Sequence, residues 1–538
     1  MKKAFALFLA ACCIFTGISF ALPIVANEAE AGDAALAQIE IATAEDFLKI
    51  GNDANFPLDG SYLLKNDIAI TSEAYVPVGT YAAPFTGSFD GNGKTVTLNV
   101  TYTNDKAKAT VADCAYVGLF GVVKTATVRN LKVAGSMKAN TVCGCMGTVI
   151  GATNGSCTVE NVVSTVEAIF DTTGDYNSMS FVGGIIGKVD GDGTVNNSST
   201  TVKGCTFSGS VKEIAKAEKA SDAKAIEYRI SGSGAAGGIV GATGWSVPKG
   251  GWGYAAVTIE ACVFDGKLHV TQGNQNIGGF LGMTPAYGKL AANGTAIVTI
   301  KNSANYGAIS RDHYVSDRMA AFAGYIWGGN VTECIYDGSL KEGTLIPDNS
   351  KTKMCPLLGW YNANGKGYMQ NCISLVAVDQ VLEKLANMTK DKCTNNYVPS
   401  DTKDKSTTGF TKLTTASTQK EQLVKEVMNK TANVEGMKDL FVAAGIGDLV
   451  SLYFDYNKPT GATTLGYQVT DVKDGAYNIR FVSLIDSLEY GKIGYDIVAT
   501  YAGGSKEFSV DCKTVYTALT ASVDMTARTV RLPWYTAA

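Results

Sequence analysis

The chain has 538 residues, of which 18% are charged, and its 46 Lys and Arg nearly balance its 50 Asp and Glu. A formal net charge of −4 gives no electrostatic footprint for nucleic acid or an anionic membrane surface, so neither is an expected partner. With 46% apolar residues the chain can bury a core, and 59 glycines against 11 prolines exclude a disordered Pro/Gly composition.

Residues 1–31 are typical of a secretory signal peptide. Two lysines precede the apolar run AFALFLAACCIFTGISFALPIVA, and small residues follow, so cleavage is expected near Ala26 or Ala31. Lipidation at Cys12 is the alternative, because LAAC resembles a lipoprotein box, but the apolar run continues well beyond this cysteine. No later stretch is apolar for long enough to span a bilayer, so the sequence predicts a secreted or cell-surface protein.

Residues 32–375 contain a repeated pattern with variable spacing. An apolar run that ends in glycine occurs seven times, with its last residue at Gly121, Gly151, Gly187, Gly241, Gly282, Gly324 and Gly359. After each run comes a segment such as VKGCTFSGSV, whose fourth position is Leu131, Val162, Cys205, Cys262, Ser303, Cys334 or Cys372. Short apolar segments divided by turns indicate strands, three in each repeat, and loops of varying length on a fixed pattern are typical of a solenoid. The sequence therefore predicts a right-handed parallel β-helix whose equivalent side chains stack about 4.8 Å apart.

Cysteine is frequent in the second segment of the repeat. Without Cys12 and Cys13, 11 of the 13 cysteines remain, so at least one thiol is unpaired within the monomer. We expect buried thiols that pack as small apolar side chains; disulfides between neighbours such as Cys205 and Cys262 are the alternative, which parallel Cβ directions disfavour. The chain has two histidines, His269 and His313, and no CxxC pair, so no metal or cofactor is expected.

The repeats GGIIG…VKGCTFSGSV and GGIVG…IEACVFDG resemble GLUG-type repeats of bacterial surface proteins, some of them associated with IgA proteases. Upstream, FTGSFDGNGKTVTLNV resembles the block that leads into the first coil of such modules. The resemblance covers residues 38–375 and implies a β-helical surface scaffold without specifying an activity. No HExxH motif is present, so zinc-protease activity is not expected.

Two further regions follow the repeats. Residues 376–452 are predicted to form a helical spacer or cap, because AVDQVLEKLANMTKDK and TASTQKEQLVKEVMNK carry apolar residues at helical spacing. Residues 453–538 contain alternating segments such as AYNIRFVSLID and GKIGYDIVATYA. These resemble a small β-sandwich module at the C-termini of exported proteins of anaerobic bacteria, and we expect a β-sandwich here.

Aromatic residues in the repeat loops are the first candidate site. Four of the five tryptophans follow repeat glycines, and a stripe of such rings could bind sugar rings or a protein partner. The alternative is that the rings only cover their own loops. The candidate residues are Trp245, Trp252, Trp327, Trp360 and Tyr361.

The segment SRDHYVSDRM is the second candidate site, with Arg311, Asp312, His313, Asp317 and Arg318. A polysaccharide lyase or glycosidase could use such residues to hold Ca²⁺ and abstract a proton, whereas a solvated charged loop is the alternative. We expect a non-enzymatic adhesion or ligand-binding protein whose partner is an extracellular glycan or a cell-surface protein. A glycan-active β-helix enzyme and a passive surface spacer are the other hypotheses.

Overall fold

A computed structural model describes the chain from Gln38 onward, with gaps. The predicted signal peptide lies outside the described residues. These are 38–104, 114–141, 144–172, 180–191, 198–215, 234–244, 255–270, 275–284, 298–311, 319–342, 354–355, 357–377, 385–386, 392–402, 410–420, 422–423, 426, 467–473, 476–481, 494–501, 504–511 and 529–532.

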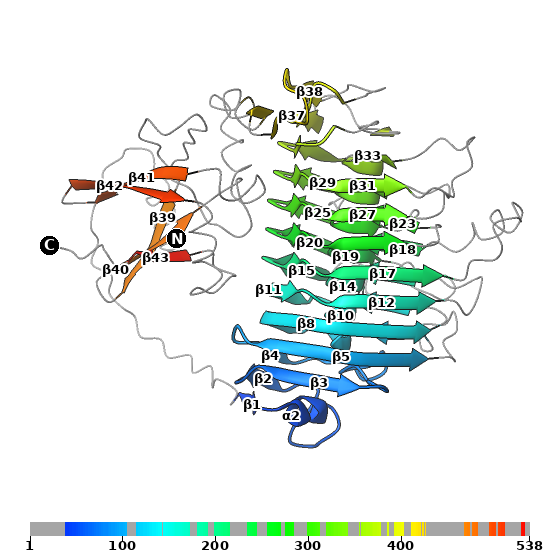
Figure 1. The fold of residues 1–538 in the computed structure, drawn as a ribbon. Coiled ribbons are helices and arrows are strands. Elements are labelled where there is room, and N and C mark those ends of the chain that lie inside the picture. Colours follow the sequence, from blue (N-terminus) through cyan, green and yellow to red (C-terminus); the bar gives the residue numbers. More distant parts are fainter. Residues whose placement is uncertain are drawn as a thin grey trace, which may run out of the picture. The chain divides into compact units, whose positions relative to one another are not determined.

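The described residues are mainly β, and most of their strands join in long parallel ladders. One sheet has 31 strands and a second has seven, and Figure 1 shows the strands stacked in chain order. The repeat in the middle of the stack consists of five short strands rather than the three predicted. They are β13 (Ser180–Gly183), β14 (Ile186–Asp190), β15 (Ser199–Lys203), β16 (Thr206–Phe207) and β17 (Ser210–Ala215).

Each strand of this repeat pairs in parallel with its equivalent in the next repeat. Val202 is in register with Ile259, and the rings of Phe207 and Phe264 stack with centroids 6.2 Å apart. Buried positions alternate with more exposed positions along β15 and β20, as expected for a sheet buried on one face. The partner strands are β18 (Gly234–Gly237), β19 (Val240–Thr243), β20 (Ala256–Glu260), β21 (Val263–Phe264) and β22 (Lys267–Val270).

The repeat glycine is required by a close approach of two chain segments. A Cβ at Gly187 would lie 2.3 Å from the backbone nitrogen of Met146 and 2.8 Å from the carbonyl carbon of Cys145. Both atoms belong to β9 (Gly144–Gly147), a strand of the seven-stranded sheet. Glycine therefore lets this sheet pack directly against the backbone of the larger one.

A left-handed backbone residue lies at the junction of the β15-type and β16-type segments in eight successive repeats, and in two of them, β8 (Thr127–Thr141) and β11 (Thr158–Ser164), the strand continues through it. Its φ lies between 49° and 62°, and asparagine, which tolerates this conformation, is its commonest type. Only one of the eight residues is glycine. These residues are Asn130, Asn161, Gly204, Ala261, Asn302, Glu333, Asn371 and Asn395.

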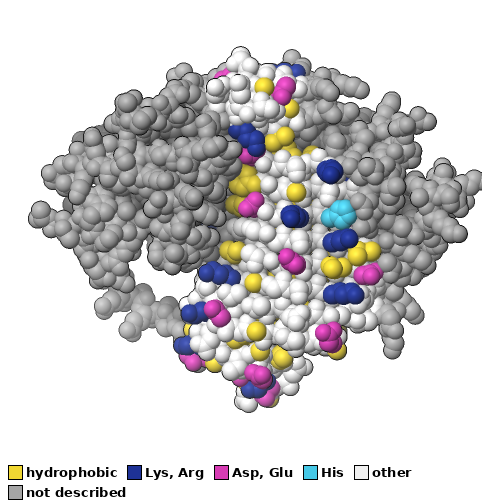
Figure 2. Space-filling view, in the orientation of Figure 1, with side chains coloured by type: hydrophobic (Ala, Val, Ile, Leu, Met, Phe, Trp, Pro, Cys, Tyr) yellow, Lys and Arg dark blue, Asp and Glu magenta, His cyan; other side chains and the backbone are white. Residues whose placement is uncertain are grey.

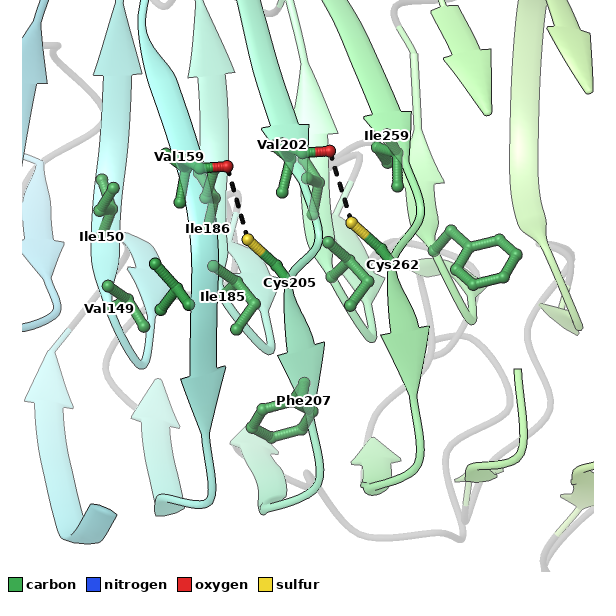
Figure 3. Packing of buried hydrophobic residues seen from close by; sticks show 14 of the residues in the cluster. Val149, Ile150, Val159, Ile185, Ile186, Val202, Cys205, Phe207, Ile259 and Cys262 are labelled. Atoms are coloured by element: carbon green, nitrogen blue, oxygen red, sulfur yellow. Dashed lines mark hydrogen bonds between the residues drawn. The ribbon is translucent and has the colours of Figure 1, made fainter. Parts of the chain in front are cut away.

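The residue after each corner points into the core, which confirms the predicted inward ladder. Cys205, Cys262, Cys334 and Cys372 are buried, free thiols, in agreement with the sequence-based interpretation. Their sulfur atoms also contact backbone carbonyls, as Figure 3 shows for Cys205 with Val159 (3.5 Å) and Cys262 with Val202 (3.4 Å). The thiols thus act as weak donors as well as small apolar groups.

A short helix, α2 (Ala44–Lys49), follows the first strand β1 (Ile39–Ile41) at one end of the stack (Figure 1). Thr43 and Asp46 form a capping box at its start, which satisfies two backbone N–H groups. Phe47 is buried, with its ring edge-on to Phe89 at 5.6 Å. The helix therefore adds an aromatic side chain to the core beside the first strands.

The structure differs from the predicted helical spacer over 376–452, because part of this region adds strands to the parallel ladders. Leu385 pairs with Tyr361, and Cys393 pairs with Met369. Stacking on the preceding repeat outweighs the helical spacing of the apolar residues. Residues 427–452 lie outside the described residues. The strands are β35 (Leu385–Ala386), β36 (Cys393–Thr394), β37 (Asn396–Val398) and β38 (Phe410–Lys412).

The C-terminal region contains antiparallel strands within the alternating segments. The strands β39 (Tyr467–Lys473), β40 (Ala476–Phe481) and β43 (Thr529–Leu532) form a three-stranded sheet, and β41 (Gly494–Tyr501) pairs with β42 (Gly504–Asp511). Their arrangement as a β-sandwich stays a prediction. Nowhere in the described part of the chain is a helix long and apolar enough to cross a bilayer.

Candidate binding surfaces

The number of residues between two consecutive strands differs widely at one equivalent position of the repeats, here called the variable corner. It is the junction between the β14-type and β15-type strands. Two residues fill it between β7 (Phe120–Lys124) and β8 (Thr127–Thr141), whereas residues 284–297 fill it between β24 (Leu281–Met283) and β25 (Val298–Lys301). The framework on both sides keeps its register, so the corner can change without disturbing the ladders.

Of the candidate aromatic residues, Trp327 lies at this corner, whereas Trp360 is in register with Tyr325 and Met283 and so belongs to a β14-type segment. Trp245 and Trp252 lie between β19 and β20, outside the described residues. Trp327 belongs to β29 (Ala323–Thr332), at a register shift, and Trp360 and Tyr361 belong to β33 (Leu358–Gln370). The backbones of Trp360 and Tyr361 pair with Tyr325 and Ile326, which places three candidates on adjacent strands. A continuous stripe of rings stays a prediction.

Of the ionisable cluster, the structure describes Arg311. This residue ends β27 (Ala308–Arg311), is 1% exposed, and is in register with the buried Val270. Its guanidinium therefore lies among buried residues and does not face solvent. Asp312, His313, Asp317 and Arg318 lie outside the described residues.

One outer face of the stack carries a column of alternating charge. Oppositely charged side chains occupy equivalent positions in six consecutive strands, and two of the pairs form ion pairs, Arg129–Asp90 at 2.9 Å and Lys301–Glu260 at 3.2 Å. Each charge has an opposite neighbour, so the column is neutral along its length. Its members are Asp90, Arg129, Glu160, Lys203, Glu260 and Lys301.

A second outer face carries cations without such alternation. We call the outward positions of β17, β22, β27 and β31 (Ser339–Glu342) the cationic face. The Nδ1 atom of His269 lies 2.8 Å from the Oγ of Ser310, and Figure 2 shows positively charged side chains near the histidine. The described outward residues form two columns: Ser210, Lys267, Ala308 and Ser339, and Lys212, His269, Ser310 and Lys341.

The sequence analysis did not identify the cationic face. Its lysines, Lys212, Lys267 and Lys341, are separated by 55 and 74 residues, a spacing that no local motif detects. The detectable signal was the residue three places after the small residue that precedes each β17-type strand. Aligning the repeats on that small residue would have placed Lys212 and Lys341 at the same outward position of the repeat.

A charged pair is buried between the two sheets. The Nζ of Lys188 lies 2.8 Å from the Oδ2 of Asp190 and 5.8 Å from the ring centroid of Phe181. Burial acts to lower the pKa of Lys188, but the Asp190 carboxylate outweighs it and the pKa is raised above its ordinary value. Both side chains are nearly removed from water, and Lys188 also approaches a ring of the smaller sheet through Phe181 of β13. In the described residues no three His, Cys, Asp or Glu side chains gather to hold a metal ion.

Comparisons with known proteins give one structural likeness. No protein-family model matches the chain, and no curated protein matches it. The likeness is to a crystal structure of a protein from Bacteroides ovatus, provisionally assigned as an immunoglobulin A1 protease. The match has a TM-score of 0.34 and 14% identity, and it covers 57% of this chain and 84% of the other. At these values the likeness identifies no shared activity.

Proposed function

We propose that the chain is an exported, non-catalytic protein of the cell surface or the extracellular medium, built on a right-handed parallel β-helix, and that it binds an extracellular partner. The observation that carries this proposal is the contrast between a constant framework and a variable corner. Parallel ladders keep their register from repeat to repeat while the junction between them varies in length. Rigid scaffolds with variable loops on one side are typical of recognition proteins.

The proposed ligand of the variable corner is a glycan. Trp245, Trp252, Trp327, Trp360 and Tyr361 would supply the flat apolar faces on which sugar rings pack, and the polar loop residues would bind the hydroxyl groups. The predicted signal peptide and the resemblance to GLUG-type repeats are the sequence-based grounds for the extracellular location in this proposal.

The test is a glycan-array and mucin-binding screen of the purified protein and a Trp245→Ala/Trp327→Ala/Trp360→Ala variant. Loss of binding in the variant, at unchanged melting temperature, is the expected result. Tyr81→Ala removes an aromatic side chain that is 43% exposed and belongs to the N-terminal part of the stack, so it serves as the matched control. A protein that binds no glycan would contradict this function and favour a passive spacer.

A further inference from the structure

The two charged outer faces differ in how their charges are arranged. In the alternating column, each of Arg129, Lys203 and Lys301 is next to a carboxylate on an adjacent strand. On the cationic face, the described outward positions of β17, β22, β27 and β31 hold no carboxylate. Within the described residues, no ion pair involves Lys212, Lys267 or Lys341. The first arrangement stabilises strand pairing, whereas the second does not.

Like charges are close together on the cationic face. Lys267 is the diagonal neighbour of Lys212, a position about 7–8 Å away. Three strand spacings separate Lys212 from Lys341, about 14 Å along the stack. Mutual repulsion makes this grouping unfavourable for folding, and an anion laid over it would remove that repulsion. Outward carboxylates border the face on β12 (Glu167–Thr172), where Glu167 and Asp171 are both diagonal neighbours of Lys212, whereas Lys267 and Lys341 have no carboxylate at a described outward position of the adjacent strands.

The side chains of the face indicate which kind of anion it could bind. No arginine supplies the bidentate fork that suits phosphate, and no Phe, Tyr or Trp lies at a described outward position of these strands for a nucleobase to stack on. Lysines supply point charges, and the hydroxyl groups of Ser210, Ser310 and Ser339 lie between them and can bond to sugar hydroxyls. These groups follow the stacking direction, so they match a ligand with charges repeated along a line.

We propose that the cationic face binds a linear polysaccharide that carries carboxylates, a polyuronate, laid along the stacking direction across β17, β22, β27 and β31. The inference deepens the proposed extracellular binding function and rests on it, but it uses a different surface from the variable corner. Single lysine–carboxylate contacts at an exposed surface are weak, so affinity should rise with the number of uronate units and fall with salt.

The test measures binding of the purified protein to polygalacturonate oligomers of increasing length, with the neutral methyl ester as comparison ligand. The face variant is Lys212→Gln/Lys267→Gln/Lys341→Gln. The control variant, Arg129→Gln/Lys203→Gln/Lys301→Gln, removes the same three positive charges from the alternating column. We expect at least a tenfold loss of affinity in the face variant and less than a twofold loss in the control variant, with melting temperatures recorded for both.

Equal losses in the two variants would overturn the proposal, because net charge alone would then explain the binding. Tighter binding of dextran sulfate or single-stranded DNA through the same lysines would overturn the choice of a carboxylate ligand. If neutral glycans bind through the tryptophans while polygalacturonate does not bind, this inference fails and the proposed function stands. If the face variant loses polygalacturonate and the tryptophan variant retains it, the cationic face is established as a separate binding surface.

Discussion

Lys188 and Asp190 form an ion pair of 2.8 Å whose side chains are 4% and 11% exposed. Two residues of one strand, β14, thus satisfy each other's charge inside the interface between the two sheets. Attraction between such charges offsets a large desolvation penalty only while both partners are present. The pair therefore adds little net stability, but the loss of one partner would be costly.

Removing one partner of this pair should cost far more than removing both. We expect Lys188→Met to destabilise the protein by about 3 kcal/mol or more, because it leaves the Asp190 carboxylate buried without its cation. The double variant Lys188→Met/Asp190→Leu should recover most of that loss. Urea denaturation of the two variants measures the difference, and equal destabilisation would show that the charges are not coupled.

Ala261 holds a left-handed backbone with φ of 57°. Ala261→Gly should raise the free energy of unfolding by roughly 0.5–1 kcal/mol, because glycine adopts this conformation without the Cβ clash. Ala256→Gly in the neighbouring strand β20 is the matched control and should lower it by a similar amount. The same sign of change in both variants would contradict this account of the corner.

The buried cysteine positions of the repeat should tolerate serine. Ser303 occupies the position of Cys262 in the next repeat, and its Oγ donates to the Lys301 carbonyl at 2.8 Å. We therefore expect Cys262→Ser to cost less than about 1.5 kcal/mol, since its hydroxyl can donate to the Glu260 carbonyl as the thiol does at 3.4 Å. Cys262→Val, which removes the donor, is the comparison. A Ser variant less stable than the Val variant would show that the donor is unimportant.

Asp337 gives the stability a defined dependence on pH. Burial raises the pKa of its carboxyl above the ordinary value, although the ion pair with Lys420 opposes this. The folded state therefore binds the proton more tightly than the unfolded state, and the contribution to stability falls as pH rises from the ordinary value through the raised one. Asp337→Asn should flatten this part of the profile. Chemical denaturation between pH 3 and pH 7, roughly the range that carboxyl titration spans, measures it; identical profiles for both proteins would refute the assignment.

The sequence predicted the parallel ladders because a repeated inward residue, from Leu131 to Cys372, marks the same strand in each repeat. It did not predict the left-handed corners, since Ala261 and Glu333 have no preference for positive φ and adopt it through the stacking of neighbouring repeats. Leu385 illustrates the same limit: its local spacing is helical, but pairing with Tyr361 makes it a strand residue. The cationic face could not be predicted because it depends on which strand residues are in register, and segments of varying length between the strands hide that register in the sequence.

The alternating column has a further consequence for assembly. The backbone hydrogen bonds of parallel strands are the same for every repeat, so they cannot distinguish the adjacent repeat from the one after it. A chain that skipped one repeat would place Arg129 beside Lys203 and Glu160 beside Glu260, and like charges would oppose that pairing. The alternating charges of the column therefore favour pairing of each repeat with its immediate neighbour over pairing with the repeat after it.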